Sequence, residues 1–217
     1  VMFIYFLLPQ VLPFRFERIR EMLGERRKFG IADFQRMQQD VTSVPARRLQ
    51  NIVRRWTPPQ RLAAPVREFL AWDARLTVDS KPGLIYELWS AKLPAAVFGP
   101  GLGGRVDLRM VLETLERGGN DKALLDSLEA ALTDLRKRLG PDEAAWNWGR
   151  LHLLHLRHPL GVASFNRGPV ARPGDGNTVN STSGSGFVQT NGASYRQILD
   201  PGDWDRSVMT NVPGESG

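Results

Sequence analysis

Three histidines form the pattern in this sequence that comes nearest to a chemical site. His152, His155 and His158 are spaced i, i+3, i+6, and on a helix they would share one face. Because imidazole nitrogens are common zinc ligands, this spacing could indicate a metal site. Two observations favour a structural role instead: His158 precedes proline, where helix is disfavoured, and no carboxylate lies beside the histidines at ligand spacing. We therefore expect them to hydrogen-bond backbone or carboxylate groups.

The serines do not form the local nucleophile motif of serine hydrolases. The G-x-S-x-G turn needs glycine two residues before and two residues after the serine. Ser185 has Ser183 at the first of these positions, and Ser216 has Gly214 but is followed by a single residue. The chain has no cysteine, which excludes disulfides, thiolate zinc sites and a cysteine nucleophile.

Other residues that could bind a ligand are better explained by a structural role. Gly99–Gly104 is expected to be a loop, and without a preceding strand it is weak evidence for phosphate binding. Asp175 lies in a glycine-rich turn and could bind a cation, although a capped turn is favoured. The Trp72–Asp73 pair and the Trp146 and Trp148 pair could be ligand platforms. Tryptophans in such pairs are more often core anchors whose N–H finds a partner.

Composition indicates a folded protein of ordinary polarity. The chain has 217 residues, of which 41% are hydrophobic and 24% charged, with a net charge of +6. The basic residues alternate with acidic ones, as in Arg15, Glu17, Arg18, Arg20 and Glu21, which is typical of a solvated helix face rather than a phosphate track. No segment predicts a membrane span. A non-enzymatic basic helical module that binds nucleic acid or a protein partner remains the alternative function.

The first two thirds of the chain predict amphipathic helices. Asp33 is expected to cap the second helix, Pro45 to kink that helix or mark its restart, and Asp79 or Ser80 to cap the helix over Pro82–Leu93. Apolar residues at helical spacing predict helices over Phe14–Leu23, Asp33–Val44, Ala46–Trp56, Leu62–Leu70, Pro82–Leu93, Asp107–Arg117 and Asp121–Leu139.

The last part of the chain changes to turns and short strands, so the expected fold class is α+β. Strands are predicted over Thr178–Asn180, Gly186–Gln189, Ser194–Leu199 and Ser207–Asn211. We expect three parts: a divergent or non-native stretch 1–13, a mainly helical region 14–145, and a β-rich segment 146–217 that is truncated at its C-terminus. Trp146–Leu160 is the expected junction between the last two.

Six motifs in order resemble the β subunit of the penicillin acylase (penicillin amidase) family of N-terminal nucleophile hydrolases. Each motif alone is weak, but their order over Arg15–Gly217 is specific. Glu215 departs from the family's usual glutamine, and Val1–Leu12 does not resemble the family's preceding sequence. The motifs are Gln38-x-Asp40-x-x-Ser43-x-x-Ala46; Leu70-x-Trp72-Asp73 with Asp79-Ser80 and Trp89; Trp146-x-Trp148-Gly149-x-x-His152 with His158-Pro159-Leu160; Phe165-Asn166-x-Gly168-Pro169 with Gly174-Asp175-x-x-Thr178-x-Asn180; Gly192-Ala193-Ser194-x-Arg196 with Asp200; and Pro213-Gly214-x-Ser216-Gly217.

This resemblance implies a hydrolase of linear amide bonds with an αββα sandwich fold, of which the present chain would be a fragment. In the family a precursor cleaves itself, and the new N-terminal serine of the β subunit is the nucleophile, with its own α-amino group as base. Partners would be the α subunit, the remainder of the β subunit and a small N-acylated substrate, with no nucleic acid. The family often carries a structural calcium ion, whereas no cofactor is expected in this fragment. The expected location is periplasmic or secreted.

The resemblance assigns one active-site residue to this chain. Arg15, with Ile19, matches an arginine at the start of the helix that follows the family's oxyanion-hole asparagine. It would orient that asparagine or the substrate, a task that suits the fixed donor geometry of a guanidinium. The alternative is a surface arginine. The nucleophilic serine and the oxyanion asparagine are expected upstream of this sequence, so the fragment alone is expected to be inactive. The family uses no metal at the positions of His152 and His158.

Overall fold

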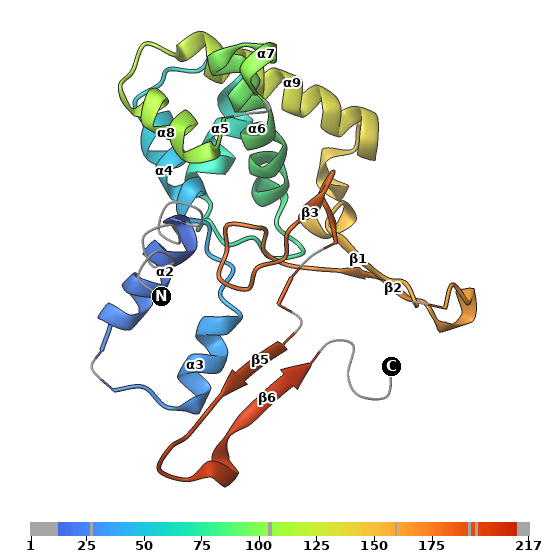
Figure 1. The fold of residues 1–217 in the computed structure, drawn as a ribbon. Coiled ribbons are helices and arrows are strands. Elements are labelled where there is room, and N and C mark those ends of the chain that lie inside the picture. The colour runs from blue at the N-terminus through green and yellow to red at the C-terminus, as the bar shows by residue number, and fades with distance from the viewer. Residues whose placement is uncertain are drawn as a thin grey trace. The chain divides into compact units, whose positions relative to one another are not determined.

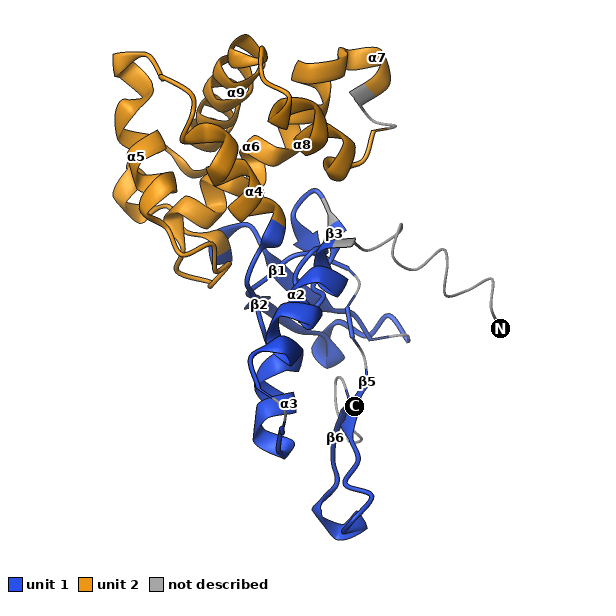
Figure 2. Cartoon of the chain, turned by 90° about the vertical axis from the view of Figure 1, so that its left-hand side faces the viewer, with its two compact units in different colours: residues 1–44, 149–217 blue, residues 45–148 orange. Residues whose placement is uncertain are grey.

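The fold belongs to the α+β class predicted from the sequence (Figure 1). The computed structural model describes residues 13–26, 28–103, 106–158, 160–190, 192–193 and 195–211. The predictions that involve Val1–Leu12, Pro159, Ser194 and Pro213–Gly217 lie outside these residues. The chain divides into two compact units: unit 1, residues 1–44 and 149–217, and unit 2, residues 45–148 (Figure 2).

Unit 2 is helical and is built around one long apolar helix, α6. Because α6 has apolar side chains on all sides, it is stable only where other helices cover it. Helices α5, α8 and α9 pack against it, and α9 makes the most extensive contact (Figure 1). The helices are α4 (Val44–Val53), α5 (Ala63–Ala71), α6 (Lys81–Phe98), α7 (Pro100–Gly103), α8 (Leu108–Glu116) and α9 (Asp121–Leu139), with 3-10 turns η1 (Gln60–Leu62), η2 (Glu143–Ala145) and η3 (Trp148–Arg150).

The start of α6 shows how local sequence fixes a helix end. The Ser80 hydroxyl accepts a hydrogen bond from the Gly83 N–H at 3.0 Å, which satisfies one of the free donors of the first turn. A Cβ atom at Gly83 would lie 2.8 Å from the Ser80 Oγ, so this helix position requires glycine. Asp107 caps α8 in the same way through the Met110 N–H.

Aromatic side chains fill the centre of unit 2. Phe69 lies 5.4 Å from Trp89, edge to face, and stacks on Tyr86. All three are fully buried. The Trp89 indole N–H donates to Ser127 at 2.8 Å, so its polar atom is satisfied inside the core. Buried Gln50 donates to the carbonyl oxygens of Phe69 and Trp72 and thereby satisfies the end of α5.

In its described residues, unit 1 combines two helices with two small sheets. Strands β2–β1–β4–β3 form a four-stranded sheet, in which β1 pairs antiparallel with β2 and parallel with β4, while β5 and β6 form a separate hairpin. Helix α3 packs beside β5. The elements are α2 (Pro13–Gly24), α3 (Ile31–Gln38), β1 (Leu153–Leu156), η4 (Ala163–Phe165), β2 (Arg167–Ala171), β3 (Gly184–Ser185), β4 (Val188–Gln189), β5 (Tyr195–Ile198), η5 (Trp204–Arg206) and β6 (Val208–Asn211).

Several local predictions were wrong. The helix predicted over Asp33–Val44 ends at Gln38, and its N-cap is Gly30, to whose N–H the Asp33 carboxylate binds from the third helical position. Part of the Gly99–Gly104 loop is the short helix α7. Residues Thr178–Asn180 form a turn rather than a strand, because their polar groups bond locally.

Candidate functional site

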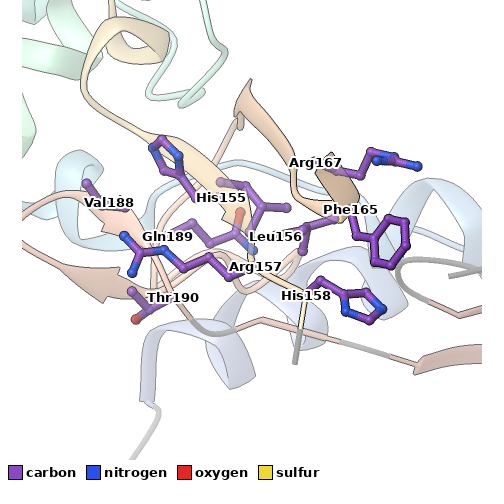
Figure 3. A pocket seen from close by; sticks show the side chains of 10 residues that line it. His155, Leu156, Arg157, His158, Phe165, Arg167, Val188, Gln189 and Thr190 are labelled. Carbon is purple, nitrogen blue, oxygen red and sulfur yellow. The ribbon is translucent and has the colours of Figure 1, made fainter. Parts of the chain in front are cut away.

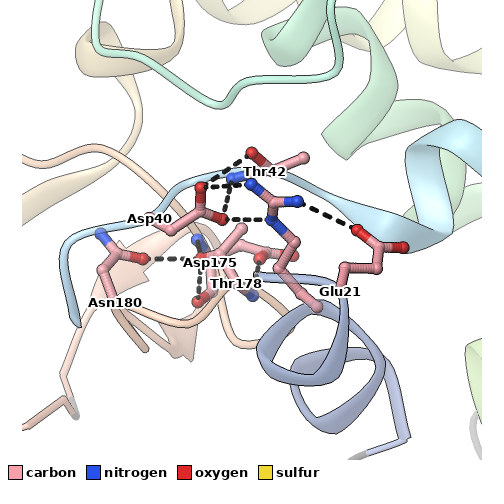
Figure 4. Close-up of polar contacts among 7 residues, drawn as sticks. Glu21, Asp40, Thr42, Asp175, Thr178 and Asn180 are labelled. Carbon is pink, nitrogen blue, oxygen red and sulfur yellow. Dashed lines mark hydrogen bonds and ion pairs between the residues drawn. The ribbon is translucent and has the colours of Figure 1, made fainter. Parts of the chain in front are cut away.

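A buried ion pair joins helix α2 to the residues after α3. The Arg18 guanidinium binds the Asp40 carboxylate through two parallel hydrogen bonds of 3.0 Å each, and Thr42 donates to the same carboxylate through its N–H and hydroxyl (Figure 4). Burial acts to raise the pKa of Asp40, but the hydrogen bonds and charge of Arg18, with the Thr42 donors, outweigh it and hold the pKa below its ordinary value. Asp40 is therefore ionised.

A second polar cluster stabilises the turn from Gly174 to Thr182. The Asp175 carboxylate accepts the N–H groups of Asn177 and Thr178, each at 2.9 Å, while Thr178 bonds to the Asn180 side chain at 2.7 Å (Figure 4). A Cβ atom at Gly174 would lie 2.1 Å from the Asn180 Oδ1, so this close approach requires glycine. The Asn180 N–H donates to the Asp40 carbonyl oxygen, which links the two clusters.

This turn is the capped structure favoured from the sequence. Both oxygens of Asp175 are engaged by donors of the turn itself. Within the described ranges, no group of three His, Asp or Glu side chains could hold a metal ion. The turn is therefore explained by its own hydrogen bonds.

Arg15, the one active-site residue assigned from the sequence, lies beside this turn. Its Nη1 donates to the Ser181 hydroxyl at 2.7 Å, and Ser181 has a backbone φ of 53°, in the left-handed region that non-glycine residues rarely adopt. Burial lowers the pKa of Arg15, while the Asp175 charge opposes this change. The Nε of Arg15 is buried and has no hydrogen-bond partner among the described residues. Its catalytic role stays a prediction.

The three histidines do not come together as a helical face. Residues Leu153–Leu156 form strand β1, so the helical spacing that could have produced a zinc site does not occur. His152 is buried, and its Nδ1–H donates to the Phe187 carbonyl oxygen at 2.7 Å, as expected for a structural histidine. Burial lowers the pKa of His152 below its ordinary value, against the effects of the Phe187 bond and the Asp175 charge.

His155 and His158 line a different feature, an open pocket of about 1000 Å³ beside the four-stranded sheet (Figure 3). The His158 ring lies edge to face with Phe165, with ring centres 5.0 Å apart. None of the described residues that line the pocket is acidic. Its wall is mostly apolar and includes Leu154 and Leu156, and among the described residues it offers no histidine–carboxylate pair for a hydrolytic reaction.

The conspicuous tryptophans and serines of unit 2 have structural roles. Trp146 and Trp148 are buried, and the Trp146 N–H donates to the Gly140 carbonyl oxygen, as expected for core anchors. The hydroxyl of Ser80 caps α6 and that of Ser90 donates to the Glu87 carbonyl oxygen. These hydroxyl groups stabilise helices rather than forming a nucleophile.

Arg172 was not singled out in the sequence, whereas Arg18 was noted only as part of a charged helix face, and Asp40 and Arg196 only as motif residues. Arg18 pairs with a residue 22 positions away, and Arg196 donates to the carbonyl oxygen of Asn180 at 2.6 Å. Arginine occurs repeatedly near the motif residues in the sequence. This pattern alone does not identify the group to which each arginine binds.

Comparison with known proteins places these observations in one family. The penicillin amidase family matches residues 4–217, and the chain belongs to this family. It is 28% identical over 179 residues to an acyl-homoserine lactone acylase QuiP from Pseudomonas fluorescens, covering 68% of this chain and 22% of the relative. It is 27% identical over 246 residues to the penicillin acylase 2 proenzyme of a Pseudomonas species, covering 94% of this chain and 30% of that relative.

These alignments cover only part of each relative. A second QuiP acylase, from Pseudomonas aeruginosa, is 24% identical over 94% of this chain and 32% of its own length. The chain thus spans between about a fifth and a third of the length of these three relatives. In the part of the chain that the structure describes, no helix has both the length and the apolar character needed to cross a membrane.

Proposed function

We propose that this chain is the scaffold part of an acylase that hydrolyses a linear N-acyl amide bond in a small molecule. Membership of the penicillin amidase family carries this proposal, because the relatives named above are acylases. The substrate class follows from those relatives, one named for penicillin and others for acyl-homoserine lactones. The full-length protein would cleave an acyl group from a substrate of this kind.

The nucleophile in this proposal is an N-terminal serine outside the present sequence. A free α-amino group with a pKa of about 8 can take the serine hydroxyl proton near neutral pH, so no histidine is required. The structure is compatible with this division, since Ser80, Ser90 and Ser127 are each committed to helix or indole hydrogen bonds. Self-cleavage of a precursor would generate the terminal serine.

Arg15 is the residue of this chain that we propose to act at the active site. Its guanidinium has one hydrogen bond, to Ser181, and a buried Nε that lacks a partner among the described residues. It thus retains donors that could orient an oxyanion-hole asparagine or the substrate. We propose it as a positioning residue, because it would act on groups that do the chemistry.

The remainder of the β subunit and an α subunit are the proposed partners. Unit 1 exposes large apolar side chains, which are normally covered by other protein when they are numerous. Examples are Phe165 on η4, Val170 on β2, Trp204 on η5 and Met209 on β6. Family resemblance is the support for a structural calcium ion elsewhere in the full-length protein and for a periplasmic or secreted location.

The binding-module alternative has no specific support among the described residues. Several arginines of unit 2 are neutralised by acidic partners, as in the Arg48–Glu116 and Arg136–Glu143 ion pairs. Such pairing reduces the positive charge that phosphate binding would use. A steep salt dependence of DNA binding would favour the alternative.

The test compares the full-length protein with the 217-residue chain on penicillin and on an acyl-homoserine lactone. We expect the full-length protein to hydrolyse at least one of them and the chain to hydrolyse neither. In the full-length protein, Arg15→Lys should lower kcat/KM by up to about 100-fold, because a misplaced reacting group can cost that much. The exposed Arg20→Lys on the same helix is the control. Activity of the chain alone that survives every serine substitution but is lost in His152→Ala would contradict the proposal.

A further inference from the structure

A smaller pocket in unit 1 has the chemistry of an anion site. Its volume is about 320 Å³, at the lower end of the range for small-molecule pockets. Leu154 and Leu156 of β1 form an apolar part of its lining, while Arg172, Arg196 and the Asn180–Thr182 turn form a polar part. An elongated molecule with one apolar and one polar end would match both parts.

Among the described residues that line it, the polar part contains two guanidinium groups and no acidic side chain. Among the residues that the structure describes, neither Arg172 nor Arg196 forms an ion pair. Arg196 donates one hydrogen bond, to the Asn180 carbonyl oxygen at 2.6 Å. The Nε of Arg172 is buried and has no partner within the described ranges. Because two neighbouring positive charges disfavour each other, an anion bound to both guanidinium groups would stabilise the site.

The charges around the pocket also favour an anionic ligand. Burial lowers the pKa of Arg196, and the positive charge of nearby Arg172 lowers it further. The nearest acidic group of the turn, Asp175, acts on Arg15 and His152 and is engaged by its own turn donors. A planar carboxylate matches the fork of a guanidinium better than a neutral group does.

We propose that Arg172 and Arg196 bind the carboxylate of a small organic acid whose apolar part lies against Leu154 and Leu156. The inference concerns binding by this chain and is independent of the proposed acylase activity. The hydroxyls of Ser181 and Thr190, which also line the pocket, can complete the hydrogen bonds to the carboxylate. The shape and charge together select a carboxylate with a short alkyl chain rather than a free inorganic anion.

The first experiment titrates the full chain with hexanoate, with hexanamide and with inorganic phosphate, by isothermal calorimetry. Hexanamide has the same shape as hexanoate without its charge. We expect hexanoate to bind at least tenfold more tightly than either of the other two. Equal binding of hexanoate and hexanamide would overturn the proposal, as would tighter binding of phosphate or no binding of hexanoate. These comparisons need no variant and so do not depend on the folding of a mutant.

The second experiment locates the site with matched substitutions. Arg172→Gln and Arg196→Gln should each weaken hexanoate binding at least tenfold, whereas Arg196→Lys should retain part of it. The control is Arg157→Gln, which removes an exposed arginine that lines the larger pocket. An equal loss in Arg157→Gln, or full binding in Arg172→Gln, would contradict the assignment. Circular dichroism of each variant verifies the fold.

Discussion

The two units use the motif residues of the family in different ways. In unit 2, Trp89 lies in an apolar core and Ser80 caps a helix. In unit 1, Asp40, Asp175 and Asn180 form a polar network around irregular backbone. Packing stabilises unit 2, whereas hydrogen bonds determine the conformation of the unit 1 turns. These motif residues therefore have structural roles in both units.

The largest expected effect tests whether packing in the apolar core stabilises unit 2. Trp89→Ala removes a fully buried side chain at the centre of unit 2 and should lower the free energy of unfolding by about 4 kcal/mol. Denaturant titration gives the value. Trp204→Ala, which removes an exposed indole from unit 1, should change it by less than about 0.5 kcal/mol. A change below about 1 kcal/mol for Trp89→Ala would mean that packing is not what stabilises unit 2.

The second prediction tests whether the polar network of unit 1 contributes to stability. Asp40→Ala removes the two hydrogen bonds between this carboxylate and the part-buried Arg18 guanidinium, which keeps its more exposed ion pair with Glu21, at an expected cost of about 2 kcal/mol. Since the folded pKa of Asp40 is lowered, its contribution is present above about pH 4 and is lost as pH falls through the folded pKa. The free energy of unfolding of the wild type and of Asp40→Ala, measured as a function of pH, tests both the size of this cost and its pH dependence.

A matched control for this pair is Asp126→Ala, which breaks an exposed ion pair with Lys122. Exposed pairs contribute little, so a change within about 0.5 kcal/mol is expected. If Asp40→Ala and Asp126→Ala lowered the free energy of unfolding equally, the polar network of unit 1 would not contribute to stability beyond an exposed ion pair.

The third prediction concerns the cap of α6. Ser80→Ala removes the acceptor of the Gly83 N–H and should lower the free energy of unfolding by about 1 kcal/mol. Asp79→Ala changes the neighbouring residue without removing the cap and is the control. Equal losses in the two variants would mean that the capping bond is not responsible.

The smallest expected effect is the pH dependence due to His152. Its folded pKa is lowered, so the unfolded chain binds the proton first as pH falls. The stability that neutral His152 contributes is present above about pH 6.5 and decreases below it. An NMR titration should give an imidazole pKa below 6.5, with His152→Gln identifying the resonance. A pKa above 6.5 would contradict the burial argument.

Much of unit 2 could be predicted from the sequence because its signals are local. The prediction for α9, Asp121–Leu139, has the observed bounds, and Ser80, one of the two expected caps, is the N-cap of α6. Apolar periodicity and capping residues act within a few positions of one another, so a single sequence reveals them.

Unit 1 was less predictable because its partners are distant in the chain. Strand β1 was missed: Leu153–Leu156 lacks an apolar–polar alternation, and its register depends on Ala171 and Gln189. The Arg18–Asp40 pair and the Arg196–Asn180 bond likewise join residues 22 and 16 positions apart. Turn residues such as Gly174 were visible, but the donors that the turn receives were not.

The most direct test of the account is to identify the nucleophile of the active full-length protein. Peptide mass spectrometry with N-terminal sequencing would locate the new terminus after processing. The account predicts a terminal serine outside this sequence, whose substitution by alanine abolishes N-acyl hydrolysis. Activity of an unprocessed protein, or loss of activity on substitution of Ser43 or Ser80 in a correctly folded variant, would contradict it.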